Sequence, residues 1–141
     1  PSRSSAASDV YKRQQYILAV DRDNPAVADL YHTMHPAVLM ALQQVVTAAK
    51  AVAIPVSLCG ELAGDPAGAL LLMGMGYDSL SMNAASLPKV KSVIRNFTLS
   101  QSQVMLQQAL QQVCADGVQG VIRDNLKAAG LTRLHSRYVG N

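Results

Sequence analysis

The sequence has almost no aromatic side chains and few charges, and both deficits exclude classes of partner. It contains no Trp and one Phe, and charged residues make up only 15% of the chain. Proteins that bind nucleic acid use aromatic rings as stacking platforms and gather Lys and Arg on one face. The net charge is +3, of which residues 1–14 carry +2, from three basic residues and one acidic residue. We therefore expect no nucleic-acid partner.

Long apolar runs and paired cysteines are also missing. No apolar run reaches the length of about 20 residues that a membrane-spanning helix needs. Residues 1–14 are rich in Ser and Arg and lack the apolar core of a secretory signal. The two cysteines, Cys59 and Cys114, stand far apart and outside CxxC or zinc-type spacings. We therefore expect a cytoplasmic protein with neither a membrane segment nor a structural disulfide.

The composition is apolar: hydrophobic residues make up 50% of the 141 residues. This length suffices for one modest domain or for a piece of a larger one. Because a free-standing soluble domain is usually more polar, we expect sequence outside this chain to cover part of its apolar surface. Residues 1–14 differ sharply from the rest in composition, and we expect either a disordered leader or sequence foreign to the domain.

Three short segments predict β-strands that alternate with helices. The strands are expected at residues 16–20, 54–58 and 78–83. A strand-helix order with short links is typical of parallel βα units. The sequence therefore predicts an α/β fold whose three strands cannot close a barrel by themselves, followed by helices alone.

Helix boundaries are predicted from caps, prolines and glycines. Four helices are expected to start at a capping residue followed by proline or shortly before one: Asn24-Pro25, His35-Pro36, Asp65-Pro66 and Ser86-Leu87-Pro88. The second of these is expected to end near Val52. A further helix is expected to start at a capping box of Ser100 and Gln103 and to end near Cys114, and a last one is expected at residues 118–129. The segment 67–75 is apolar nearly all round, so we expect that helix to be buried and to end at Gly74 or Gly76.

Cys59 is the first candidate for chemistry. It ends a predicted strand, and functional groups of α/β sheets and barrels gather at the carboxyl ends of strands. Gly60 leaves room for a ligand to approach the backbone. Two interpretations stay open at this point: a buried structural cysteine, or a nucleophile or proton donor, for which His32 and His35 are the candidate bases.

Arg22 and the nearby carboxylates are the second group of candidates. Arg22 follows another predicted strand, and its guanidinium either grips a phosphate or carboxylate or pairs locally with Asp21 and Asp23. Glu61, the single glutamate, caps the next helix, orients the thiol loop or pairs with Arg22, and Asp65 is expected to cap the next helix. His32 and His35 are spaced like a ligand pair, but no third metal ligand accompanies them, so we expect no metal site in this chain.

Three segments together resemble a known family. They are QYILAVDR at residues 15–22, CGELAGD at 59–65 and GMGYDSLSM at 74–82. The series is similar to the C-terminal, phosphoenolpyruvate (PEP)-binding barrel of the PEP-utilising enzymes, most closely Enzyme I of the bacterial phosphotransferase system and its nitrogen-related paralogue. The resemblance covers residues 14–130.

The resemblance implies a reaction and roles for two residues. In the family, a phosphoryl group passes from PEP to a histidine on a mobile N-terminal domain and then to an HPr-like phosphocarrier protein. Cys59 matches the cysteine that exchanges a proton with C3 of the enolate, and Arg22 matches an arginine that grips the substrate phosphate. The fold implied is the last three βα units of a (β/α)8 TIM barrel plus C-terminal helices, with Mg²⁺ as cofactor and a homodimer as the parent assembly.

One stretch departs from the family pattern. The family has Thr-Asn-Asp-Leu-Thr just before the position of Gln15, where this chain has Val-Tyr-Lys-Arg-Gln at residues 10–14. A lysine there cannot replace a carboxylate that ligates Mg²⁺. We therefore expect residues 1–14 to be foreign, residues 15–115 to form a partial barrel, and 116–141 to form a C-terminal helix and frayed tail. The 141 residues by themselves, an incomplete C-terminal fragment, are expected to be inactive.

Two other functions remain open from the sequence. Pyruvate phosphate dikinase and PEP synthase share the cysteine and the barrel, and the residues that would separate them from Enzyme I lie upstream of Tyr16. A non-catalytic α/β binding module, in which Cys59 is only structural, is the alternative from a different class.

Overall fold

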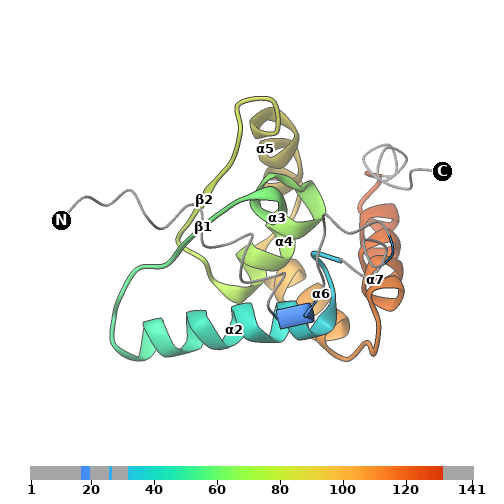
Figure 1. Ribbon diagram of the computed structural model, residues 1–141. Coiled ribbons are helices and arrows are strands. Elements are labelled where there is room, and N and C mark those ends of the chain that lie inside the picture. Colours follow the sequence, from blue (N-terminus) through green and yellow to red (C-terminus); the bar gives the residue numbers. More distant parts are fainter. Residues whose placement is uncertain (1–16, 20–25, 27–31, 132–141) are drawn as a thin grey trace.

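The computed structural model describes residues 17–19, 26 and 32–131. In chain order its elements are α2 (Pro36–Ala51), β1 (Ser57–Cys59), α3 (Glu61–Gly64), α4 (Pro66–Met75), β2 (Ser79–Ser81), α5 (Leu87–Asn96), α6 (Leu99–Leu110) and α7 (Ala115–Ala128). A strand-helix-strand unit from β1 to β2 leads into α5, and helices alone follow (Figure 1). The predicted mixture of strands and helices is therefore confirmed for this part of the chain.

β1 and β2 form a parallel two-stranded sheet. Its register pairs Ser57 with Ser79, Leu58 with Leu80 and Cys59 with Ser81. Side chains alternate between the two faces of a strand, so the two leucines share one face, where they contact the hydrophobic core. The three serines and Cys59 share the other. One face of the sheet is thus apolar and the other polar, and the polar face ends at Cys59 and Ser81.

β1 is shorter than the predicted strand at 54–58, and Ile54 is 58% exposed. The cause is the end of α2. Ala53 has a φ of 54°, and the Ile54 amide donates a hydrogen bond of 2.9 Å to the Ala49 carbonyl. This is a Schellman motif, in which one left-handed residue turns the chain back onto the helix end. The Ile54 amide therefore forms its hydrogen bond with the end of α2 and not with a neighbouring strand.

α4 lies at the centre of the hydrophobic core (Figure 1). Leu70, Leu71 and Leu72 are completely buried, which confirms the prediction for this apolar helix. α6 packs across α4, and Gly74 permits the close approach, since a Cβ on Gly74 would lie 2.6 Å from the Ser102 carbonyl oxygen. α7 closes the same core with Val118, Ile122 and Leu126.

Several helix ends follow the sequence signals. His35 caps α2 by accepting a hydrogen bond at Nδ1 from the Ala37 amide, α4 ends at Gly76 with a φ of 92°, and α5 begins at Leu87-Pro88. The other predicted ends lie elsewhere in the structure. α6 stops at Leu110 instead of near Cys114, and α7 begins at Ala115 instead of residue 118.

The predicted capping box of Ser100 and Gln103 is wrong. Thr98 and Gln101 form it instead: the Gln101 amide donates to Thr98 Oγ1 at 3.2 Å, and the Thr98 amide donates to Gln101 Oε1 at 2.8 Å. The chain contains two overlapping patterns with a hydroxyl residue three positions before Gln. Phe97, buried directly before Thr98, fixes the entry of the chain and so selects the earlier pattern.

The predicted strand at 16–20 is also wrong for the residues that can be described. Ile17 and Leu18 are helical, and Ala19 has a φ of 52°, which turns the chain out of an extended conformation. Tyr16, Val20, Arg22 and the predicted helix start at Asn24-Pro25 lie outside the described residues.

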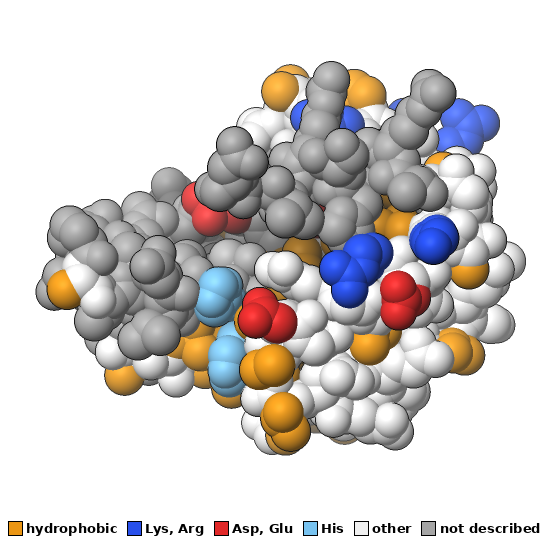
Figure 2. All heavy atoms as spheres, turned by 90° about the vertical axis from the view of Figure 1, so that its right-hand side faces the viewer, with side chains coloured by type: hydrophobic (Ala, Val, Ile, Leu, Met, Phe, Trp, Pro, Cys, Tyr) orange, Lys and Arg blue, Asp and Glu red, His pale blue; other side chains and the backbone are white. Residues whose placement is uncertain are grey.

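The described surface carries many large apolar side chains, as the composition led us to expect. Nine are exposed: Ile17, Met40, Val45, Val52, Ile54, Leu87, Leu99, Val104 and Val113. Figure 2 shows apolar side chains on the face that carries α7, where charged groups of both signs lie between them. Among the described helices, none combines the length and the apolar character that crossing a membrane requires.

Candidate functional site

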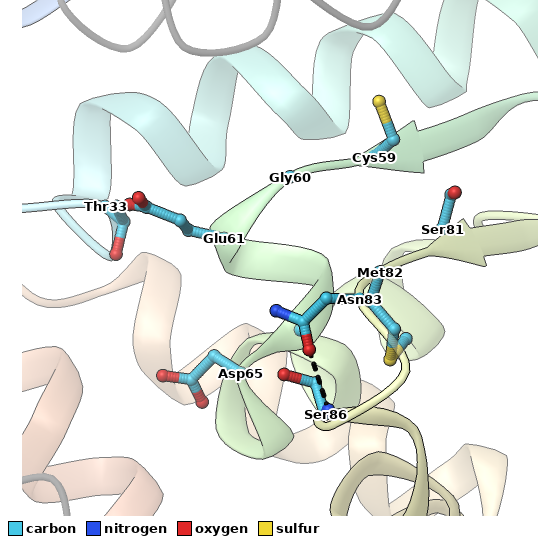
Figure 3. A pocket seen from close by; sticks show the side chains of 10 residues that line it. Thr33, Cys59, Gly60, Glu61, Asp65, Ser81, Met82, Asn83 and Ser86 are labelled. Carbon is cyan, nitrogen blue, oxygen red and sulfur yellow. Dashed lines mark hydrogen bonds between the residues drawn. The ribbon is translucent and has the colours of Figure 1, made fainter.

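A hollow of about 580 Å³ lies at the carboxyl ends of β1 and β2 (Figure 3). Residues from three segments line it: the end of β1 and the loop and helix that follow (within 59–65), the end of β2 and the turn that follows (within 81–86), and Thr33 before α2. Because both strands are parallel, their carboxyl ends meet at one edge of the sheet. The structure thus places Cys59 where the sequence predicted it, at the end of a strand and beside open space.

Cys59 is half-buried, and its thiol belongs to the wall of this hollow. The next residue, Gly60, has a φ of 132°, which L side chains rarely adopt, and its amide donates to the Ser81 carbonyl at 3.4 Å. Figure 3 shows the Cys59 and Ser81 side chains rising from the same face of the two strands. Gly60 therefore turns the chain away from the sheet immediately after the thiol and leaves the thiol on the rim.

Asp65 holds the start of α4, as predicted. Its Oδ1 accepts hydrogen bonds from the Ala67 amide at 2.7 Å and from the Gly68 amide at 3.2 Å. Burial raises the pKa of the Asp65 carboxyl above its ordinary value of 3.8, and the two backbone hydrogen bonds oppose that shift. The side chain is one wall of the hollow, and its Oδ1 caps the helix.

Glu61 occupies the first turn of α3, where a carboxylate is favoured by the helix N-terminus. The side chain is exposed, and Figure 3 shows it directed toward Thr33 and away from Cys59. Its predicted pairing with Arg22 stays a prediction, because Arg22 lies outside the described residues.

The exit of β2 adds residues that were not singled out from the sequence. Ser81, Met82, Asn83 and Ser86 all line the hollow. Asn83 Oδ1 accepts a hydrogen bond of 2.9 Å from the Ser86 amide, which shapes the turn into α5. The sequence signal was the run of polar residues after the strand, but which of them faces Cys59 depends on the register between the strands.

No metal site is formed by the part of the chain that can be described. There, no group of three or more His, Cys, Asp or Glu side chains converges. His32, His35, Cys114 and Asp116 line a separate hollow of about 500 Å³, but they do not gather as a ligand set. The described residues therefore do not fit Mg²⁺ by themselves, since this ion needs oxygen ligands in octahedral geometry.

Comparison with known proteins identifies the family. The sequence pattern described as "PEP-utilising enzyme, PEP-binding domain" matches residues 13–99. A phosphoenolpyruvate-protein phosphotransferase of Haemophilus influenzae is 44% identical over 112 residues, which are 79% of this chain and 20% of the relative. A protein of the same name from Buchnera aphidicola subsp. Baizongia pistaciae is 44% identical over 108 residues, 77% of this chain and 19% of the relative.

A third relative, from Escherichia coli, carries the name phosphoenolpyruvate-dependent phosphotransferase system. It is 38% identical over 117 residues, 83% of this chain and 16% of the relative. The chain thus spans a fifth or less of the length of these relatives. The matched residues include Cys59, the hollow and both strands. The chain therefore belongs to the PEP-utilising enzymes, within their PEP-binding domain.

Proposed function

We propose that this chain is part of an enzyme that transfers the phosphoryl group of PEP to a protein histidine, the first step of a phosphotransferase relay. The observation that carries the proposal is the Cys59 thiol on the rim of the hollow, at the carboxyl ends of two parallel strands. The names of the relatives support phosphotransfer over the dikinase and synthase alternatives. A purely structural cysteine would not require the hollow beside it.

The proposed role of Cys59 is general acid–base catalysis. When the phosphoryl group leaves the enol oxygen of PEP for the histidine nitrogen, the enolate of pyruvate remains. The S–H bond of Cys59 then breaks, its electron pair stays on sulfur, and the proton forms a C–H bond with C3 of the enolate to give pyruvate. A positioned proton donor of this kind contributes about 10²- to 10⁴-fold in rate. Because the thiol gives up only a proton, it requires no adjacent histidine base.

The remaining parts of the reaction are proposed on the resemblance. Arg22 is proposed to bind the substrate phosphate through its planar guanidinium. Mg²⁺ is proposed as a cofactor of the whole enzyme, with ligands other than the described residues, and no step above depends on it. An HPr-like phosphocarrier protein is the proposed acceptor, and a cytoplasmic homodimer is the proposed assembly of the parent enzyme.

The fold proposed for the whole domain is a (β/α)8 barrel. Support comes from the sheet, whose apolar face contacts the core that the helices build. The two strands are parallel and joined by helices, which is the repeating unit of such a barrel. Residues 15–115 are proposed as the barrel part and residues 116–141 as a C-terminal helix and tail.

A chimaera tests the proposed function. The matched 112 residues of the Haemophilus influenzae relative are replaced by those of this chain, and PEP-dependent phosphorylation of the carrier is measured by mass spectrometry. Exchange of the C3 protons of pyruvate for deuterium is followed by NMR. We expect Cys59→Ala to slow both by about 10²-fold or more, whereas Cys114→Ala, which removes an exposed thiol, changes neither.

Two outcomes would contradict the proposal. A folded chimaera that binds PEP but transfers no phosphoryl group would exclude the function. Full activity of the Cys59→Ala chimaera would exclude the thiol as the proton donor. The 141 residues alone are expected to give no phosphotransfer, which provides the baseline for the assay.

A further inference from the structure

The side-chain amide of Asn83 has a fixed orientation at the hollow. Its Oδ1 accepts a hydrogen bond of 2.9 Å from the Ser86 amide, and a backbone N–H can only donate. The oxygen of the side chain therefore faces Ser86, and Nδ2, with its two N–H groups, lies on the other side. Figure 3 shows this nitrogen directed away from Ser86, toward the side of the hollow where Glu61 and Asp65 lie.

The two N–H groups of Nδ2 form no hydrogen bond with another described residue, and Asn83 is exposed at the hollow. Among the described residues that line the hollow, none is Lys or Arg, and two, Glu61 and Asp65, carry carboxyl groups. This wall therefore meets an anionic ligand with neutral donors. The hydroxyl groups of the wall can donate or accept, whereas Nδ2 can only donate, so it suits an acceptor such as a carboxylate.

Asn83 lies close to the position opposite the thiol. It follows Ser81 by two residues, and Ser81 is the register partner of Cys59. Two residues span at most about 7 Å of chain. A three-carbon acid that offers C3 to Cys59 can therefore reach Nδ2 with its carboxylate.

We propose that Asn83 is a substrate-binding residue: Nδ2 donates a hydrogen bond to the carboxylate of the three-carbon acid, in PEP before phosphoryl transfer and in pyruvate after it. Hydrogen bonds to charged groups are stronger than those between neutral groups. Because the carboxylate keeps its charge throughout the reaction, the contact stabilises the bound substrate and the transition state alike. The inference rests on the proposed function and adds to it the residue that holds the end of the substrate remote from C3.

The test uses the chimaera described above, with Cys59 unaltered. Isothermal titration calorimetry measures the Kd of PEP and, separately, of pyruvate, and phosphorylation of the carrier gives KM and kcat. Asn83→Asp keeps an oxygen that accepts from the Ser86 amide but replaces the donor by an acceptor. It is expected to raise both Kd values by roughly tenfold or more, the effect of losing a hydrogen bond to a charged group. The KM for PEP should rise with them while kcat stays nearly unchanged.

Two further variants separate the donor from the turn and from charge. Asn83→Ala removes both the donor and the oxygen that accepts from the Ser86 amide, and it is expected to weaken binding no more than Asn83→Asp does. Ala84→Asp places a carboxylate on the next residue, which is exposed and does not line the hollow. Because an exposed charge is screened by salt, this variant is expected to leave both Kd values nearly unchanged. Circular dichroism checks that each variant is folded.

Weaker binding of both PEP and pyruvate by Asn83→Asp, with kcat maintained, supports the inference. Unaltered binding by Asn83→Asp would overturn it, since Asn83 would then act through the turn alone. An equal loss in Ala84→Asp would also overturn it, because the added charge would explain the effect, and so would a fall in kcat at constant KM. In these cases phosphotransfer by the chimaera with Asn83 unaltered leaves the proposed function intact. A chimaera that binds no PEP with Asn83 unaltered would overturn both.

Discussion

Gly74→Ala is predicted to destabilise the chain, although alanine favours a helix over glycine. Gly74 lies in α4, and a Cβ there would lie 2.6 Å from the oxygen and 2.9 Å from the carbon of the Ser102 carbonyl in α6. An ordinary carbon–oxygen contact is about 3.3 Å or longer. Because the atoms approached belong to a backbone, no side-chain rotation can relieve the contact, and the two helices would separate by roughly 0.7 Å.

The magnitude follows from two opposing terms. Replacing glycine by alanine in a helix gains about 1 kcal/mol of intrinsic propensity. Overpacking of a well-packed core costs typically about 1–3 kcal/mol, occasionally more, and the α4–α6 interface is the most extensive one between described elements. We therefore expect a net loss of up to about 2 kcal/mol in the free energy of unfolding, or up to about 6 °C in the midpoint of thermal unfolding.

Gly120→Ala is the matched control. Gly120 is also inside a helix, α7, but a Cβ there would meet only the end of the Arg123 side chain, at 3.6 Å. This variant is expected to be about 0.5–1 kcal/mol more stable than the original chain. Unfolding by heat and by urea, followed by circular dichroism, measures both. Equal effects of the two substitutions would refute the reasoning, since the contact with Ser102 would then have no energetic consequence.

The other predictions concern single residues. Ala53→Gly should stabilise the chain by about 0.5–1 kcal/mol in urea unfolding, because the left-handed conformation at φ 54° costs an L residue about 1 kcal/mol or more; no gain would contradict this. Ser102→Ala should be neutral or stabilising by about 1 kcal/mol, because Ser102 Oγ is buried with no hydrogen-bond partner among the described residues. A clear loss of stability would contradict this, because it would mean that the hydroxyl makes a hydrogen bond. Asp65→Ala should cost about 1 kcal/mol through loss of the cap, as measured by urea unfolding. Asp65→Asn keeps the oxygen that caps the helix but removes a titrating group. Because burial raises the pKa of Asp65 in the folded state, the Asp65 carboxyl contributes its full stabilisation below the pKa of the unfolded state. That stabilisation declines as pH rises through the pKa of the folded state. The stability of the Asp65→Asn variant relative to the original chain should therefore increase with pH, and a constant difference would exclude the raised pKa.

Much of the local structure could be predicted because its causes are local. His35 before Pro36 and Asp65 before Pro66 do mark helix starts, and in each case the cap accepts from an amide only two or three residues away. Burial of α4 followed from the absence of any polar face. The position of Cys59 at a strand end followed from the short apolar run before it and the Gly after it.

Where two local patterns competed, the sequence could not choose between them. Thr98 and Ser100 both stand three residues before a Gln, and burial of Phe97 decides for Thr98. The apolar residues before Ser57 have strand propensity, yet Ala53 adopts a left-handed conformation and the Ile54 amide closes α2. In both cases contacts of the folded chain overrode a preference that several residues shared.

By itself, the sequence determined which residue types could do the chemistry: a thiol followed by glycine, in a motif of the PEP-utilising enzymes. Only the tertiary structure decided what stands beside the thiol. The register of β1 with β2 places Ser81 opposite Cys59, and the packing of α4 on α6 places Gly74 against Ser102. Such pairs join segments that are distant in the sequence, and a shift of one residue in register would turn every side chain of a strand to the other face. Their identity is therefore fixed by pairing and packing, which no local pattern contains.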